Sequence, residues 1–523
     1  MSTECILLLL FAQTKCLDHN QLLSLLKPAD IDEFDRSPCL PNTRQDIIKF
    51  ITNWTVEESM DRKQVLWING LAGSGKSTLS TTIAYMMRDL HRLGGFFFFD
   101  RDISERNAAT MFRTLAYQLA MFDENLGIQV SQIVKKYPNI ASMPLDFQFK
   151  NLLTAQALAA FQWTRAPIVL VIDALDECGS RKALMQALLK GFSDLPPFLQ
   201  IVIVSRPEPD IENVLEFHPA VQPYHLDIST QTTKDDILVF LQYRMDEMRK
   251  ANRYLMLPSD WPGDDKVQLL LQYAGGLFIW ASTACLYMES YNPSHHLDEL
   301  LQVAQQPENI SSGPFAKLDQ LYRTGLKAAG SWTDPDFKSD CCTILGVILC
   351  SRTPCSSSAI DSIVALPQPC LQIISHLRCV LEWQPNSPIR ILHPSFYDYL
   401  STSRSHGEPW FIDIEVYHCK FALYCIQLLE KNLKENICGL VLPYPVQDQT
   451  LSEAVSYACK FWIEHVCMIS EDAVNIGNRI YEFLCQHLLH WIESMAVLKN
   501  HDNTILLLES LLVWVKVCLI VIL

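Results

Sequence analysis

Gly70-Leu-Ala-Gly-Ser-Gly-Lys-Ser77 is the most specific stretch of this sequence, because it matches the pattern Gly-x-x-x-x-Gly-Lys-Ser/Thr. The run Val65–Asn69 before it is apolar like a buried strand, and Ser77–Leu90 behind it has a helical pattern. A strand, a glycine-rich loop and a helix in this order predict a phosphate-binding loop in a parallel α/β domain. The alternative is a glycine-rich turn that binds nothing.

The residue types of this loop fit phosphate chemistry. Its glycines allow the main chain to curl so that N–H groups face an anion, and the helix behind the loop adds its dipole. Lys76 would place its charge at the β and γ phosphates, and Ser77 would offer its hydroxyl to Mg²⁺. We therefore expect ATP or ADP with Mg²⁺ at this loop. The binding residues would be Gly70, Gly73, Ser74, Gly75, Lys76, Ser77 and Thr78.

A second acidic motif follows the apolar run Ile168–Asp173. A carboxylate at the carboxyl end of a buried strand can hold Mg²⁺, so we assign Asp173 to the metal together with Ser77. Hydrolysis also needs a carboxylate that activates the attacking water, and Ala174, the neighbour of Asp173, has none. We therefore assign this role to Asp176 or Glu177 in the following turn, and their displaced position predicts slow hydrolysis. In the alternative interpretation, either acid is solvated in the turn or pairs with a basic residue.

A third candidate residue is Arg206, which follows the apolar run Gln200–Ser205. A guanidinium at this strand end could contact the γ-phosphate. The competing interpretation is an ordinary surface arginine.

Alternating strand and helix patterns extend through the region around these motifs and predict a parallel sheet covered on both faces. The predicted strands are Val65–Asn69, Phe96–Asp100, Ile168–Asp173, Gln200–Ser205 and Val221–Asp227. The predicted helices between them are Ser77–Leu90, Ala109–Phe122, Leu145–Trp163 and Arg181–Ser193.

Helical patterns dominate from Thr232 onward. We expect helices at Lys234–Arg249, Val267–Tyr287 and Phe315–Ala328. A winged-helix outline comes next, with helices Ser357–Ala365 and Cys370–Cys379, strands Val380–Gln384 and Ile389–His393 around a Pro-Asn-Ser-Pro turn, and helix Ser395–Leu400. The predicted division is a lead-in (1–62), a P-loop NTPase core (63–230), a helical domain (231–330), a winged-helix-like domain (331–402) and a C-terminal helical region (403–523).

Composition narrows the class of protein. Of 523 residues, 49% are hydrophobic, which excludes collagen and low-complexity disorder. The net charge of −16 argues against a broad nucleic-acid-binding face, so we expect the winged helix to pack against the nucleotide domain instead. The 18 cysteines include no Cys-x-x-Cys pair and mostly lie in apolar surroundings, which indicates a reducing, cytoplasmic environment.

The two ends of the chain raise the question of targeting. The apolar start contains Glu4 and lacks the basic leader of a signal peptide. The last residues, Thr504–Leu523, are strongly apolar but include Glu509 and Lys516. Charges within a span disfavour insertion, so a buried helix is preferred over a membrane anchor.

Taken in order, Gly70–Ser77, Asp173-Ala-Leu-Asp-Glu177 and Ser205-Arg-Pro207 resemble the NACHT family of signal-transducing NTPases, of the STAND class. The resemblance is to the fungal, NLR-like branch and spans residues 35–440. Further matching stretches are Cys39–Arg44, Phe96–Arg101, Ala274–Ala281 and Leu392–Leu400.

The resemblance implies a switch rather than a metabolic enzyme. In such proteins ADP is clamped by the helical and winged-helix modules, and exchange for ATP permits oligomerisation with like or other protein chains. It implies roles in fungal innate immunity or programmed cell death. It also places His393 on the ADP β-phosphate and Gly276-Leu277 near the base, although Phe278 stands where relatives have proline. Relatives commonly carry a repeat-built sensor, which we do not find after the helical segment.

The leading hypothesis is therefore an ATP/ADP-dependent signalling switch with weak NTPase activity. A second hypothesis is an interaction scaffold with a degenerate nucleotide site, suggested by Ala174 and Phe278. A third is a membrane-tethered regulator that uses Thr504–Leu523.

Overall fold

The computed structural model describes most of the chain. The described residues are 21–31, 36–57, 62–101, 103, 105–159, 161, 166–179, 181–252, 257–289, 292–305, 315–384, 387–437, 451–470 and 473–522. The apolar start of the chain, Trp163, the first two residues of the Pro-Asn-Ser-Pro turn and Leu523 lie outside this set. The chain divides into two units, Met1–Cys285 and Leu286–Leu523.

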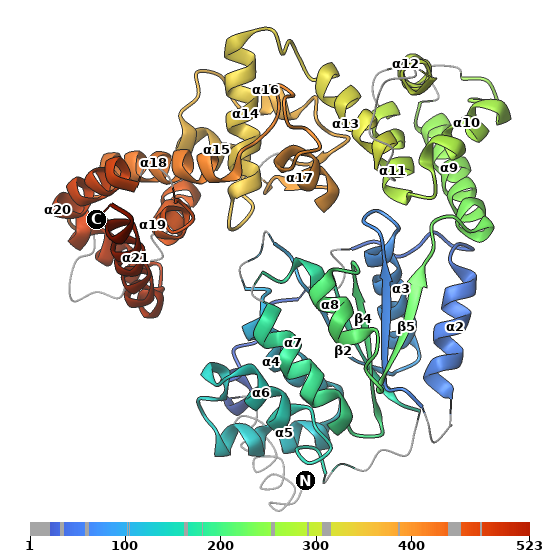
Figure 1. The fold of residues 1–523 in the computed structure, drawn as a ribbon, viewed down its shortest axis with the longest axis horizontal. Helices are drawn as coiled ribbons and strands as arrows, with labels where there is room; N and C mark the ends of the chain where they lie inside the picture. The colour runs from blue at the N-terminus through green and yellow to red at the C-terminus, as the bar shows by residue number, and fades with distance from the viewer. Residues whose placement is uncertain are drawn as a thin grey trace, which may run out of the picture. The chain divides into compact units, whose positions relative to one another are not determined.

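A five-stranded parallel sheet forms the centre of the first unit (Figure 1). Its strand order is β2-β3-β4-β1-β5. The strands are β1 (Val65–Gly70), β2 (Leu93–Phe98), β3 (Ile168–Asp173), β4 (Leu199–Ser205) and β5 (Val221–Leu226). The predicted parallel α/β fold is confirmed. Because all strands run the same way, the carboxyl ends of β1, β3 and β4 meet at one edge, where the candidate residues stand.

Both faces of the sheet are covered, as the apolar strands require. Leu66 and Ile68 of β1 pack in one core with helices α2 (Gln45–Val56) and α3 (Lys76–Asp89). Val65 and Trp67, which point the opposite way, pack in a second core. The second core is built by α4 (Ala108–Phe122), α5 (Glu124–Lys136), α6 (Leu145–Leu152) and α7 (Arg181–Gly191). Helix α8 (Pro209–Leu215) precedes β5.

Strand β2 differs from its prediction at both ends. It begins at Leu93 rather than Phe96 and ends at Phe98 rather than Asp100. The earlier start includes Gly94 and Gly95, which in sequence suggest a turn. In the structure a Cβ at Gly94 would overlap Ile168 of β3, and one at Gly95 would crowd Gln118 of α4. Glycine is therefore used here for close packing inside a strand.

In the first unit, one predicted helix is shorter than expected and another is divided in two. The helix predicted over Leu145–Trp163 ends at Leu152, and the described residues 153–159 form turns. The helix predicted over Val267–Tyr287 is two helices, α10 (Asp264–Ala274) and α11 (Phe278–Met288). Gly275 and Gly276 separate them with φ values of 56° and 84°, in the left-handed region that ends a helix. Helix α9 (Gln231–Ala251) precedes this pair.

The second unit is helical apart from one ribbon, among the residues described. Of the predicted helix pair, the first is present as α15 (Ser357–Val364), whereas the second, predicted over Cys370–Cys379, is a single turn, α16 (Leu371–Ile374). The ribbon consists of β6 (Leu381–Glu382) and β7 (Arg390–Ile391), which pair antiparallel, and α17 (Pro394–Ser401) follows. The remaining helices are α12 (Pro293–Gln305), α13 (Ala316–Ala328), α14 (Pro335–Cys350), α18 (Ile414–Asn432), α19 (Glu453–Val466), α20 (Ala473–Val497) and α21 (His501–Ile522).

The final helix, α21, is partly packed within its unit. Leu511 and Trp514 are buried, and the Trp514 indole donates a hydrogen bond to the carbonyl of Ile469 at 2.7 Å. Val513 on the same helix is 60% exposed. Within the described residues, no helix combines the length and apolar character that crossing a membrane requires.

The cysteines behave as the sequence predicted. Cys285, Cys379, Cys425 and Cys459 are all buried, and all cysteines whose side chains the structure describes are free thiols. The four buried cysteines therefore act as small apolar side chains of the cores.

Candidate nucleotide-binding site

The loop between β1 and α3 has the main-chain shape that the sequence predicts. Gly70 ends β1, and Gly73 and Gly75 have φ values of 78° and 87°, which only glycine adopts without strain. Helix α3 begins at Lys76, and no side chain caps its first turn. The first N–H groups of a helix lack intrahelical acceptors, so they are available to an anion at this end.

Lys76 lies over this loop. Its ammonium donates hydrogen bonds to the carbonyls of Gly70 and Leu71, at 2.9 Å each. Burial lowers the pKa of Lys76 to about 8, while the charge of Asp176 and, more weakly, that of Asp173 raise it. The lysine and both acids thus lie within electrostatic reach of one another, as a shared phosphate and metal site requires.

Asp173 ends β3 and is fully buried. One carboxylate oxygen, Oδ2, accepts a hydrogen bond from Arg36 at 2.5 Å. The other, Oδ1, is buried without a hydrogen-bond partner among the described residues. A buried carboxylate oxygen that is unpaired is a suitable ligand for a hard cation, so Asp173 and the hydroxyl of Ser77 fit Mg²⁺.

The turn after β3 holds the two other predicted acids. Ala174 adopts φ 54° and starts the short helix η3 (Leu175–Glu177). Asp176 accepts a hydrogen bond from the main-chain N–H of Arg206 at 2.9 Å and forms an ion pair with its Nε at 3.1 Å. The interpretation that left Asp176 paired with a basic residue is therefore the observed one, and Arg206 is that residue. The catalytic role of Asp176 and the γ-phosphate role of Arg206 stay predictions.

Glu177 is half-buried at the end of this turn. Burial, and then the negative charge of Asp176, raise its pKa to about 8, although Arg101 and Arg36 act in the opposite direction. A carboxyl with this pKa carries a proton at neutral pH, so it is a weak acceptor of a proton from water below about pH 8.

No role was predicted for Arg44, although it ends the stretch Cys39–Arg44 that contributes to the family resemblance. The Arg44 guanidinium donates to the carbonyl of Ser74 in the phosphate loop and to the hydroxyl of Thr233. It also lies 4.8 Å from the centre of the Phe278 ring. Arg44 therefore connects the phosphate loop to α9 and α11. The resemblance includes this stretch but does not predict the contacts of Arg44, because its partners are distant in sequence.

The start of α11 closes over the phosphate loop. The N–H of Ile279 donates to the carbonyl of Gly73 at 3.1 Å, and a Cβ at position 73 would overlap the Ile279 side chain. Phe278, the departure from proline, lies close to Gly75. The predicted proximity of Gly276-Leu277 to the base stays a prediction, whereas the next two residues contact the loop.

His393 belongs to the second unit. It stands at the N-terminus of α17, where its Nδ1 accepts a hydrogen bond from the N–H of Ser395 at 3.1 Å. The Ser395 hydroxyl is 2.7 Å from that of Tyr322. The structure thus gives His393 a helix-capping role, and its predicted contact with ADP stays a prediction.

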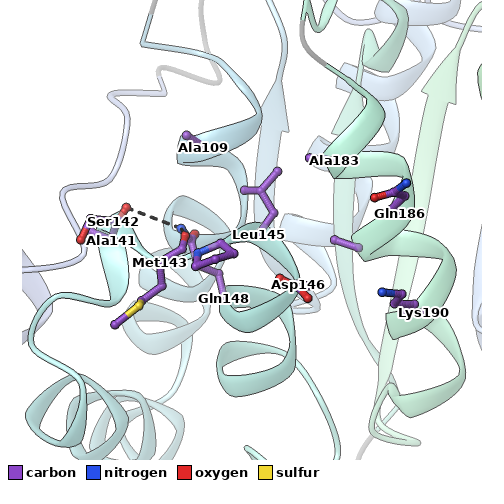
Figure 2. A pocket seen from close by; sticks show the side chains of 12 residues that line it. Ala109, Ala141, Ser142, Met143, Leu145, Asp146, Gln148, Ala183, Gln186 and Lys190 are labelled. Carbon is purple, nitrogen blue, oxygen red and sulfur yellow. Dashed lines mark hydrogen bonds between the residues drawn. The ribbon is translucent and has the colours of Figure 1, made fainter. Parts of the chain in front are cut away.

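A separate cavity of about 440 Å³ lies elsewhere in the first unit. Figure 2 shows side chains of α4, α6 and α7 around it, including Gln148 and Lys190. None of the predicted site residues lines this cavity.

One known protein family matches the part of the chain that contains the motifs. The family described as "Nephrocystin 3, N-terminal" matches residues 42–206, which include the phosphate loop, Asp173 and Arg206. With the relative described next, this match confirms that the chain resembles the NACHT-type NTPases of the STAND class, of the fungal NLR-like kind.

The matching relative is vegetative incompatibility protein HET-E-1 of Podospora anserina, which is 24% identical over 500 residues, or 86% of this chain. The chain spans about a third (35%) of the length of that relative.

Among solved structures, a STAND protein with a tetratricopeptide repeat sensor from Pyrococcus horikoshii is 13% identical, with 94% of this chain and 60% of that chain covered and a TM-score of 0.41. A DNA polymerase III gamma subunit-related protein of Thermotoga maritima is also 13% identical, covers 64% and 96%, and has a TM-score of 0.24. Superpositions at these scores carry no information on function.

Proposed function

We propose that this chain is an ATP/ADP-binding switch of the NACHT type that uses Mg²⁺ and has weak NTPase activity. One observation carries the proposal: the glycine loop, the ammonium of Lys76 and the buried carboxylate of Asp173 meet at one edge of a parallel sheet. Main-chain amides, an ammonium and a carboxylate are together the donor set that a Mg²⁺–nucleotide needs.

Slow hydrolysis follows from the two acids of the η3 turn. Asp176 is engaged by Arg206, and the raised pKa of Glu177 keeps that carboxyl protonated at neutral pH. Neither acid is then a free base for an attacking water. A nucleotide that is bound firmly and hydrolysed slowly suits a switch better than a metabolic catalyst.

The cellular role we propose is signalling in fungal vegetative incompatibility or a related innate-immune or cell-death response. The similarity to HET-E-1 supports it. The partners would be the nucleotide and, in the activated state, further copies of the chain or other proteins. The free thiols of the described cysteines are compatible with the cytoplasm, where we place this role.

Nucleotide binding by the purified protein tests the proposal. We expect ADP and ATP to bind with micromolar dissociation constants, and Lys76→Ala to weaken binding at least about tenfold because the phosphates lose their cation. Lys190→Ala is the matched control, since Lys190 lies on α7 at the separate cavity and should leave affinity unchanged. If wild type binds neither nucleotide below millimolar concentration, the switch is refuted.

The scaffold hypothesis predicts a different result in the same samples. For a scaffold, the oligomeric state measured by light scattering would be the same with ADP, with ATP and without nucleotide. Asp173→Asn would likewise leave partner binding intact. A nucleotide-dependent change in mass that Asp173→Asn abolishes would favour the switch.

A further inference from the structure

Residues 36–44, which we call the N-terminal strap, run along the phosphate-binding domain and are held at three points. Arg36 pairs with Asp173, the N–H of Cys39 donates to the hydroxyl of Thr82 on α3 at 2.8 Å, and Arg44 donates to the carbonyl of Ser74. The strap therefore connects the metal carboxylate, the helix behind the phosphate loop and the loop itself. Each of these contacts joins the strap to a residue that is distant from it in the sequence.

Arg36 is held in place by two contacts, an ion pair and an aromatic ring. Its guanidinium lies 2.5 Å from Oδ2 of Asp173 and is stacked 4.0 Å from the centre of the Phe98 ring. The Asp173 side chain is 1% exposed, while that of Arg36 is 24% exposed. A buried carboxylate requires a compensating cation, and Arg36 supplies it from the solvent side.

Mg²⁺ and Arg36 require the same carboxylate. Both carry positive charge, and two cations a few ångströms apart repel each other strongly where water is excluded. Oδ1 of Asp173, the unpaired oxygen, is itself buried, so an incoming ion reaches it only if a neighbouring group moves. Of the groups that contact this carboxylate in the described part of the chain, the partly exposed Arg36 is the one that can move into solvent.

We propose that Arg36 competes with the divalent cation for Asp173, so that loading of Mg²⁺–nucleotide releases the first residues of the strap. This inference rests on the proposed nucleotide-binding function and adds a regulatory contact to it. The position of Arg36 would then depend on the state of the nucleotide site: Arg36 contacts Asp173 when no metal is bound and leaves it when the metal binds. Cys39 and Arg44 bind away from the carboxylate, so their contacts remain in both states.

Competition makes a directional prediction for Arg36→Ala. Without the guanidinium, Mg²⁺ meets an uncompensated buried carboxylate, and the Mg²⁺ concentration that half-saturates binding of a fluorescent ATP analogue should fall by roughly tenfold, the scale of a charge-assisted hydrogen bond. Arg36→Lys, which keeps the charge, should give a smaller fall. Arg106→Ala is the matched control, because Arg106 is also stacked 4.0 Å from Phe98 but donates to the carbonyl of Asp30. We expect it to shift the midpoint less than about twofold.

Chemical modification of the Arg36 guanidinium in the wild-type protein supplies a readout that needs no variant. Phenylglyoxal, followed by mass spectrometry of the peptides, should modify Arg36 faster with Mg²⁺ and ATP than with ATP and EDTA, because the guanidinium leaves Asp173. The buried Arg44, which keeps its contact with Ser74, should react slowly in both conditions.

The outcomes separate this inference from the proposed function. If wild type binds nucleotide, but Arg36→Ala needs as much Mg²⁺ as wild type or more, competition is wrong and Arg36 orients Asp173 or is structural. An equal rate of Arg36 modification with and without Mg²⁺ would overturn it as well. If wild type binds no nucleotide at all, the proposed function fails first.

Discussion

The loops that follow β1 and β3 lie at the same edge of one sheet but use opposite kinds of chemistry. After β1, residues 70–77 present main-chain groups, and their shape depends on glycines with positive φ. After β3, residues 173–177 present carboxylates, and arginines from other elements neutralise two of them: Arg36 at Asp173 and Arg206 at Asp176. A backbone site is fixed by local conformation, whereas a carboxylate site depends on which cations the fold brings to it.

Replacing Gly73 by alanine should disturb the first loop most. The new Cβ would overlap Ile279 and would sit on a residue with φ 78°, so strain and overpacking add. We expect a loss of about 2–4 kcal/mol in the free energy of unfolding, measured by urea denaturation, together with weakened ADP binding. Gly179→Ala is the control, because a Cβ there meets nothing within 4 Å. Equal effects of the two substitutions would mean that the conformation of the loop is not what glycine protects.

Breaking the ion pair between Asp176 and Arg206 should lower the free energy of unfolding by a smaller amount. Its side chains are 5% and 17% exposed, so removing one partner leaves a mostly buried charge. We expect Asp176→Asn and Arg206→Ala each to lower the free energy of unfolding by about 1–3 kcal/mol, and the double variant to lose less than the sum. Strict additivity in this double-mutant cycle would show that the two side chains do not stabilise each other.

The smallest effect should come from Glu177, as a dependence of the free energy of unfolding on pH. Its pKa is about 8 in the folded chain against 4.5 in the ordinary state, so between these values only the folded state holds the proton. Stability should therefore fall as pH rises from about 4.5 to 8 and level off above, by on the order of 1 kcal/mol for a group that solvent partly reaches. Glu177→Gln should lack this decline. Thermal melting across this pH range measures it, and parallel curves for both proteins would contradict the raised pKa.

The sequence predicted the elements that depend on local pattern. The apolar runs of β1 and β3 begin at the predicted residues, because buried strands of a parallel sheet are continuously apolar. Predictions failed where one residue type serves two purposes. Glycines in β2 serve close packing, whereas Gly275 and Gly276 end a helix, and periodicity alone distinguishes neither use.

The candidate site was predicted in the same uneven way. Lys76 and Ser77 were found because the glycine motif carries them at fixed spacing, and Asp173 was found because it ends an apolar run typical of a buried strand. No role was predicted for Arg36 or Arg44, because each contacts a partner far away in the sequence: Arg36 contacts Asp173, and Arg44 contacts Ser74. Charge pairs between distant segments leave no spacing in a sequence.

The order of residues alone determined that this protein has a glycine-rich loop between a strand and a helix and a carboxylate at a strand end, since glycine conformation and apolar runs act over a few neighbouring residues. Only the folded chain decided which cations meet those carboxylates and which side chains close over the loop. The strand order β2-β3-β4-β1-β5 brings the ends of β1, β3 and β4 together, and packing then sets Arg36, Arg206 and Ile279 around them. Electrostatic and packing energies depend on separation in space, which the separation of residues along the chain does not give.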